Sequence, residues 1–156
     1  MQQELWDFAA ALYARPALAQ HCLTAQDEYG ADVCLLLTAL WLEQRGQPLD
    51  RALAARLQQV AGDWQQAVCT PLRTLRRAWK AAAATDAALA GLRQQLASLE
   101  LDAERCLLAR LQQCIDAWPR TSTPDALTGD WLGALLPAPA AAGLAAALRE
   151  QARPQA

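Results

Sequence analysis

The sequence predicts an all-α protein, a single-domain bundle of about six helices. β-Branched apolar residues, which favour strands, are limited to three valines and one isoleucine among 156 residues. Leucine, alanine, glutamine, arginine and glutamate, which form helices well, dominate instead. Aspartates suited to cap helices and glycines suited to end them recur between the apolar stretches.

The first two predicted helices are separated by a proline. Apolar residues recur at helical spacing over 4–14, and this pattern stops before Pro16. Because proline fits the first turn of a helix, Pro16 can open a second helix that runs to about Tyr29. Gly30 can then adopt the left-handed conformation that ends it.

Three further helices follow, and each is preceded by an aspartate that can cap it. They are expected over 33–45 after Asp32, from 51 to about 62 after Asp50, and over 64–83 after Asp63. Pro71 falls inside the last of these helices. It removes one backbone hydrogen bond, so it should kink the helix or mark its true start.

The sixth predicted helix, over 86–118, is the longest. Its leucines alternate three- and four-residue spacing in a heptad-like seam that loses phase at Arg110, where a kink would fall. We expect this helix to pair with the 64–83 helix as an antiparallel hairpin. A coiled-coil dimer is the alternative, so the oligomeric state stays open.

The composition changes after Pro119. Proline, threonine, alanine and glycine dominate the rest of the chain, which predicts a helical domain over 1–118 and a C-terminal extension over 119–156. We expect the extension to be loosely attached, with short helices over 131–136 and 140–151 and a disordered end. Trp131 would then be exposed.

Composition also excludes several classes of protein. The net charge of −2 gives no general attraction to nucleic acid or anionic membranes. The longest apolar run, 33–42, is about half the roughly 20 residues that a membrane span needs. The first five residues lack the features of a signal peptide. We therefore expect a soluble, cytoplasmic protein with no membrane partner. Its five cysteines lack C-x-x-C spacing and are interpreted as buried thiols.

Reactive side chains are sparse. The single histidine, His21, lies beside Cys22, but adjacent helical residues point about 100° apart and cannot form a nucleophile–base pair. Ser98 and Ser122 lie outside any nucleophile elbow, and no glycine-rich phosphate loop occurs. The sequence thus predicts no catalytic residue, metal ligand or cofactor. An enzyme would have to use carboxylates and arginines alone.

A polar segment precedes the 33–45 helix and includes Gln26, Asp27 and Asp32. Asp32 is explained as a helix cap. Asp27 falls in the last turn of the preceding helix, where the helix dipole disfavours an anion. This departure indicates a cationic partner elsewhere in the fold, or a functional use.

A basic stripe lies on the 64–83 helix. Its members follow i, i+3, i+4 and i+7 spacing and share one face: Arg73, Arg76, Arg77 and Lys80. Such a stripe could bind phosphate, an RNA backbone or an acidic protein. It could instead pair with carboxylates inside the protein, for which the candidates are Asp27, Asp32, Glu100 and Glu104. We expect Arg73 and Arg77 to pair internally, and Arg76 and Lys80 to face outward.

Three ordered motifs give the chain a family resemblance. They are the stretch from Leu5 through Ala25-Gln26-Asp27 to Gly30-Ala31-Asp32-Val33, then VCTPLRTLRRAWK, then ELDAER. Over residues 5–111 the chain resembles a small family of uncharacterised helical proteins from proteobacteria. Cys34 stands where that family usually has asparagine. The resemblance implies an all-α cytosolic protein of unknown function, encoded near a translation-associated ATPase of the ABC-F type, and it supplies no catalytic residues.

These features favour a non-enzymatic interaction or regulatory module, which the resemblance links to translation. It would engage an acidic protein or RNA through the basic stripe and the polar segment 26–32. The alternative is a binder of a small anionic ligand, or an enzyme, with a carboxylate–arginine pocket between the second, fifth and sixth helices. A cavity with convergent polar groups would favour the alternative, whereas a solid ionic lattice would favour the interaction module.

Overall fold

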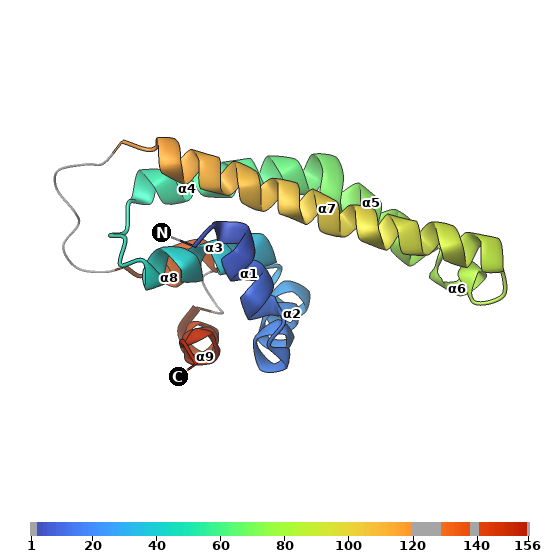
Figure 1. Ribbon diagram of the computed structural model, residues 1–156, viewed down its shortest axis with the longest axis horizontal. Coiled ribbons are helices and arrows are strands. Elements are labelled where there is room, and N and C mark those ends of the chain that lie inside the picture. Colours follow the sequence, from blue (N-terminus) through green and yellow to red (C-terminus); the bar gives the residue numbers. More distant parts are fainter. Residues whose placement is uncertain (1–2, 120–128, 138–140, 156) are drawn as a thin grey trace.

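The computed structural model describes residues 3–119, 129–137 and 141–155. Within these ranges the chain forms helices and no strand, which confirms the predicted all-α fold (Figure 1). The elements are α1 Leu5–Tyr13, α2 Pro16–Tyr29, α3 Val33–Gln44, α4 Arg51–Trp64, the π-helical turn η1 Gln65–Cys69, α5 Thr70–Ala78, α6 Lys80–Ala83, α7 Ala87–Ala117, α8 Trp131–Leu135 and α9 Ala141–Ala152. No helix in the described part of the chain combines the length and the hydropathy that crossing a membrane requires.

The predicted turn residues set the boundaries of the first helices. Pro16 is the first residue of α2, and Gly30 ends that helix with a φ of 68°. Asp32 caps α3, because its Oδ1 accepts hydrogen bonds from the backbone N–H of Cys34 at 2.9 Å and of Leu35 at 3.3 Å. The sequence predicted these features correctly.

The predicted helix boundary at Asp63 is wrong. The chain continues through Asp63 to the end of α4, and η1 then leads directly into α5. Pro71 lies in the first turn of α5. Since Pro71 has no N–H to donate to the preceding turn, the wider π-helical turn accommodates the missing hydrogen bond without ending the helical run.

A long hairpin extends from the body of the protein (Figure 1). The returning helix of this hairpin is α7. Its 31 residues span about 46 Å and continue as one helix through Arg110. As predicted, α7 packs back along α5 and α6, and it also packs on α4, which was not expected. We call residues 70–102, the outer part of this hairpin, the arm.

The core surrounds α3. Nine consecutive residues of this helix, from Cys34 to Leu42, are buried, as expected for a helix that is apolar on all sides. Its one polar member, Thr38, satisfies its hydroxyl by donating to the carbonyl oxygen of Cys34 at 2.7 Å. Of the five cysteines, Cys106 is exposed, so the expectation of buried thiols does not hold for every position.

The C-terminal helices belong to this core, which corrects the expectation of a loosely attached extension. α8 and α9 form close to the predicted ranges, and they pack on α3 and α2 respectively. Trp131 is fully buried, and its Nε1 donates to the backbone oxygen of Gln47 at 2.9 Å. Proline and alanine content misled the prediction, because the few large apolar residues in this segment are the ones that pack. Residues 1–2, 120–128, 138–140 and 156 lie outside the described residues, and with them Ser122 and the expected first residue of the 140–151 helix.

Candidate functional site

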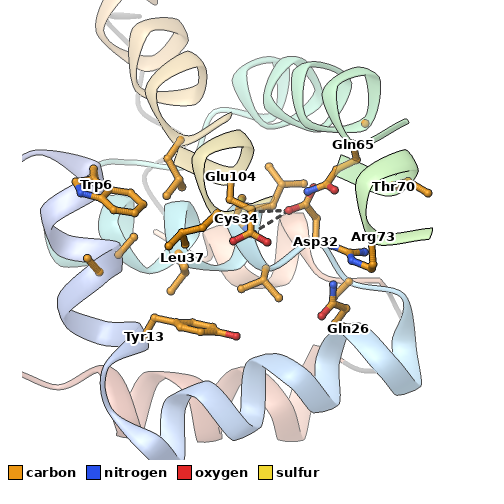
Figure 2. A pocket seen from close by; sticks show the side chains of 18 of the residues that line it. Trp6, Tyr13, Gln26, Asp32, Cys34, Leu37, Gln65, Thr70, Arg73 and Glu104 are labelled. Carbon is orange, nitrogen blue, oxygen red and sulfur yellow. Dashed lines mark hydrogen bonds between the residues drawn. The ribbon is translucent and has the colours of Figure 1, made fainter. Parts of the chain in front are cut away.

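A cavity of about 750 Å³ opens beside the start of α3 (Figure 2). Its walls come from α1, the end of α2, α3, α4, η1, α5 and α7. Apolar side chains form most of the lining, and Trp6 lies at one end. Polar side chains gather toward the other end, namely Gln26, Asp32, Gln65, Thr70 and Arg73, and Glu104 lies between the two ends.

Asp32 is fixed at the cavity wall by its role as the cap of α3. Besides the two backbone N–H groups, the side chain of Gln65 in η1 interacts with it and acts to lower its pKa. Burial raises the pKa of Asp32, and these hydrogen bonds together with the charge of Arg73 oppose the rise. The carboxylate is therefore held in place, and its neighbours offset only part of the cost of burying its negative charge.

Arg73 reaches the cavity from α5 and contacts Gln26 on α2. With the amide of Gln26 oriented so that its oxygen faces the guanidinium, Oε1 accepts from both Nη atoms of Arg73 at 3.2 Å. The charge of Arg73 acts to lower the pKa of both Asp32 and Glu104. Among the described residues, however, no ion pair of 4.0 Å or less joins Arg73 to either carboxylate.

Glu104 projects from α7 toward the middle of the cavity (Figure 2). Its side chain is half-buried, and the described part of the chain offers it no hydrogen-bond or ion-pair partner. Burial raises the pKa of Glu104, and the nearby charges of Glu100 and Asp32 add to the rise. A carboxylate that is costly to ionise and faces an open volume is typical of a functional site.

Two further groups around the cavity are held neutral. Burial raises the pKa of the Tyr13 phenol, which comes from α1. Burial also raises the pKa of the Cys34 thiol well above its usual value, with the charges of Asp32 and Glu104 adding to it. A thiol in that state is a poor nucleophile.

The remaining predicted site residues lie away from the cavity. Asp27 is exposed on α2. Arg76 forms an ion pair with Glu100 on α7, so its predicted outward position is wrong. Arg77, which was expected to pair internally, is exposed, as is Lys80. Arg76 and Arg77 thus take the opposite of their expected positions. The orientation of α5 against α7 explains this, since it turns Arg73 and Arg76 inward.

Sequence reasoning missed Trp6, Tyr13 and Gln65. Trp6 and Tyr13 are seven residues apart on α1, a spacing that also describes ordinary core positions. Gln65 reaches Asp32 from η1, and the one hint of that turn was the proline that follows it. The structure does bring together Gln26, Asp32, Arg73 and Glu104, which come from three separate motifs.

Residues 4–111 match the family described as protein of unknown function (DUF2390). This range includes every residue that lines the cavity and excludes α8 and α9. Comparisons with curated proteins and with solved structures gave no match. Because the matched range covers well over half of the 156 residues, the chain belongs to the DUF2390 family.

Proposed function

We propose that the protein binds a small organic molecule in this cavity. The observation that carries the proposal is the convergence of Gln26, Asp32, Arg73 and Glu104 on a single cavity of about 750 Å³. Cavities of roughly 300–1,000 Å³ with a mainly apolar lining and a few convergent polar groups are typical of small-molecule sites. The cavity thus favours the ligand-binding alternative over an interaction module.

The distribution of side chains suits an amphipathic ligand. The apolar wall includes Leu108 and Leu101, and Leu101 is 55% exposed although it lines the cavity. A bound apolar group would remove this leucine from water, which is favourable by about 25 cal/mol per Å² buried. The polar end would orient the molecule.

The lining supports binding better than covalent catalysis. Its described residues include no histidine and no serine, and the thiol of Cys34 is held neutral. We therefore propose a binding protein and assign no reaction to it.

The neutral fluorophore N-phenyl-1-naphthylamine tests the proposal. Gly62 lies exposed at the edge of the cavity, and a Cβ placed there would meet no atom within 4 Å, so Gly62→Phe should fold and obstruct the cavity. Gly91→Phe is the matched control, because Gly91 is equally open but lies on the arm. We expect saturable binding to the wild type and to Gly91→Phe, and binding at least about tenfold weaker to Gly62→Phe. Equal binding by all three proteins would contradict the proposal.

Docking of a macromolecule on the arm is a second candidate function, in line with the interaction module expected from the sequence. Leu75, Leu92 and Leu99 are 45%, 53% and 50% exposed on this arm, and the exposed Arg77 and Lys80 lie on the same arm. Exposed apolar and basic residues together suit a protein or RNA interface.

The double substitution Arg77→Glu with Lys80→Glu tests this second candidate. A mixed RNA probe should bind the wild type with a steep dependence on salt, and the double variant should lose this binding without losing stability. If neither protein binds RNA and both capture the same proteins from native lysate, the arm has no such role. The link to translation rests on the family resemblance.

A further inference from the structure

We infer that the ligand of this cavity carries a positively charged nitrogen, which binds Glu104 while the apolar body of the ligand lies against Leu101 and Leu108. This inference rests on the proposed function. It differs from the small anionic ligand that the sequence offered as the alternative for a carboxylate–arginine pocket. Three properties of the cavity support it.

The first property is the charge of the lining. The described residues that line the cavity include three charged side chains, namely Asp32, Arg73 and Glu104. With both carboxylates ionised, their sum is −1. A monovalent cation would make the site neutral, whereas an anionic ligand would raise the uncompensated charge to −2 in a partly buried volume, where such charge is costly.

The second property is the use of the available donors and acceptors. With the amide of Gln26 oriented toward it, Arg73 donates to Gln26, and Asp32 already accepts from two backbone N–H groups of α3. An anion that bound Arg73 would have to share its guanidinium with Gln26 and sit in the field of two carboxylates. A cation needs only the carboxylate of Glu104, which has no partner among the described residues.

The third property is the aromatic wall on α1. Tyr13 lines the cavity and is 43% exposed, so its ring is open to a bound group. Cations are attracted to aromatic faces within about 6 Å of the ring centre. The Trp6 ring already has the guanidinium carbon of Arg105 at 4.8 Å from its centroid, which leaves Tyr13 as the freer ring. Figure 2 shows Tyr13 and Glu104 on facing walls of the cavity.

Three probes that share one apolar body and differ in the head group test the inference. They are 4-phenylbutylamine, 4-phenylbutanol and 5-phenylpentanoate, each with the same phenylbutyl body, titrated calorimetrically at pH 7 and low salt. A hydrogen bond to a charged group contributes about 1.5–3 kcal/mol, so the amine should bind at least about tenfold more tightly than the alcohol. The carboxylate should bind most weakly.

Two variants of α7 identify the group responsible. Glu104→Gln keeps the shape of the side chain and removes its charge, so it should lower the affinity for the amine to that for the alcohol and leave the alcohol unchanged. Asp102→Asn is the matched control, because Asp102 is an exposed acid on the same helix that does not line the cavity. It should preserve the preference for the amine.

The outcomes separate this inference from the proposed function. If the amine and the alcohol bind wild type equally, or if the preference survives Glu104→Gln, the charge assignment is wrong and the cavity remains a binding site. Failure of the amine to bind a cavity that accepts N-phenyl-1-naphthylamine also overturns the inference. If the fluorophore fails as well, the proposed function itself is overturned.

Discussion

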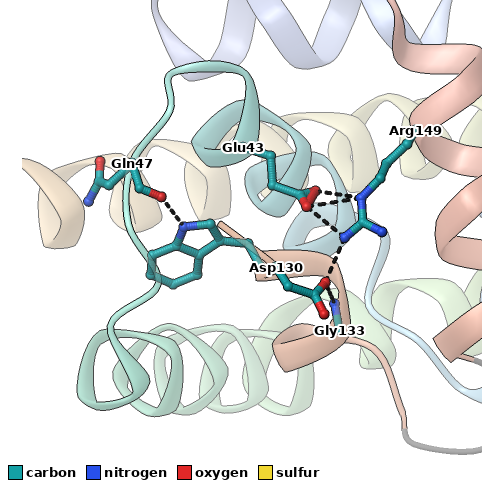
Figure 3. A network of polar contacts seen from close by, with 6 residues as sticks. Glu43, Gln47, Asp130, Gly133 and Arg149 are labelled. Atoms are coloured by element: carbon teal, nitrogen blue, oxygen red, sulfur yellow. Dashed lines mark hydrogen bonds and ion pairs between the residues drawn. The ribbon is translucent and has the colours of Figure 1, made fainter. Parts of the chain in front are cut away.

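Two clusters of charged side chains differ in whether their charges meet. In the C-terminal cluster, Arg149 on α9 donates from Nη2 to Glu43 Oε1 at 2.7 Å and to Asp130 Oδ1 at 2.6 Å, and its Nε lies 3.0 Å from Glu43 Oε1 (Figure 3). In the cavity cluster, the arginine and the two carboxylates are held apart. The same residue types thus form a closed network in one place and an open one in the other.

The electrostatic consequences follow from this difference. The hydrogen bonds to Glu43 and Asp130 raise the pKa of Arg149, and the backbone N–H of Gly133 together with Arg149 lowers the pKa of Asp130. Burial raises the pKa of Glu43, and Arg149 opposes this rise. The paired charges of the C-terminal cluster connect α3, α8 and α9 and have no free partner to offer a ligand. The charges of the cavity cluster are separated, so they remain available to bind one.

The largest expected effect on stability contrasts a tryptophan of the C-terminal helices with one at the cavity. Trp131→Ala should lower the free energy of unfolding by about 3–5 kcal/mol, because the indole is fully buried and its removal leaves a large void. Trp6→Ala should cost less than half as much, since Trp6 is partly exposed at the cavity. Guanidinium denaturation of both variants measures the difference. Equal losses would mean that the cavity side is packed as tightly as the C-terminal side.

The next effect contrasts the two arginines. Arg149→Met should cost about 1–2 kcal/mol, between the values for exposed and buried ion pairs, because Arg149 is partly exposed but Glu43 is largely buried. Arg73→Met should cost less than about 1 kcal/mol, since Arg73 forms no direct ion pair with the cavity carboxylates. Denaturation curves at low and high salt compare them. If Arg73→Met proves as costly as Arg149→Met, the cavity cluster is an internal lattice and not an open site.

A smaller effect concerns two glycines at the cavity, where substitution changes no charge. Gly62→Ala should stabilise the protein by about 0.4–1 kcal/mol, because Gly62 is helical and a Cβ there meets no neighbour. Gly30→Ala should destabilise it by about 1 kcal/mol, because the φ of 68° at Gly30 is unfavourable for alanine. Thermal unfolding should show shifts of opposite sign. If both substitutions shift the unfolding temperature in the same direction, the backbone conformations of Gly62 and Gly30 do not determine the effect of these substitutions.

Local signals made most of the fold predictable. Asp32 and Asp50 cap helices and Gly30 ends one, as their side chains and conformational freedom dictate. Local signals failed at Asp63, because an aspartate can equally lie within a helix. They failed again for Trp131, whose burial depends on a distant partner, the backbone of Gln47.

The candidate site was predictable only in part. Motif reasoning selected Gln26, Asp32, Arg73 and Glu104, which do converge. It could not tell which charges meet, because that depends on how α5 is rotated against α7. That rotation pairs Arg76 with Glu100 and leaves Glu104 facing the cavity.

The smallest expected effect is the most direct test of the open cluster. Burial raises the pKa of Glu104 above its value in the unfolded chain, which is about 4.3. The folded wild type therefore loses stability relative to Glu104→Gln as the pH rises from below that value through the raised folded pKa. Asp32, Arg73, Tyr13 and Glu100 face or influence this group in both proteins, so their own titration largely cancels in the comparison.

At pH 7, Glu104→Gln should accordingly unfold at a higher temperature than the wild type, because its free energy of unfolding is larger by less than about 1 kcal/mol. This difference in unfolding temperature should narrow as the pH approaches 4. Asp102→Asn, which removes an exposed charge from the same helix, should show no comparable pH dependence. Thermal unfolding of the three proteins between pH 4 and pH 8 measures the effect. A lower unfolding temperature for Glu104→Gln at pH 7 would show that the charge of Glu104 is already satisfied within the protein, as that of Glu43 is by Arg149. The contrast between an open and a closed cluster would then fail.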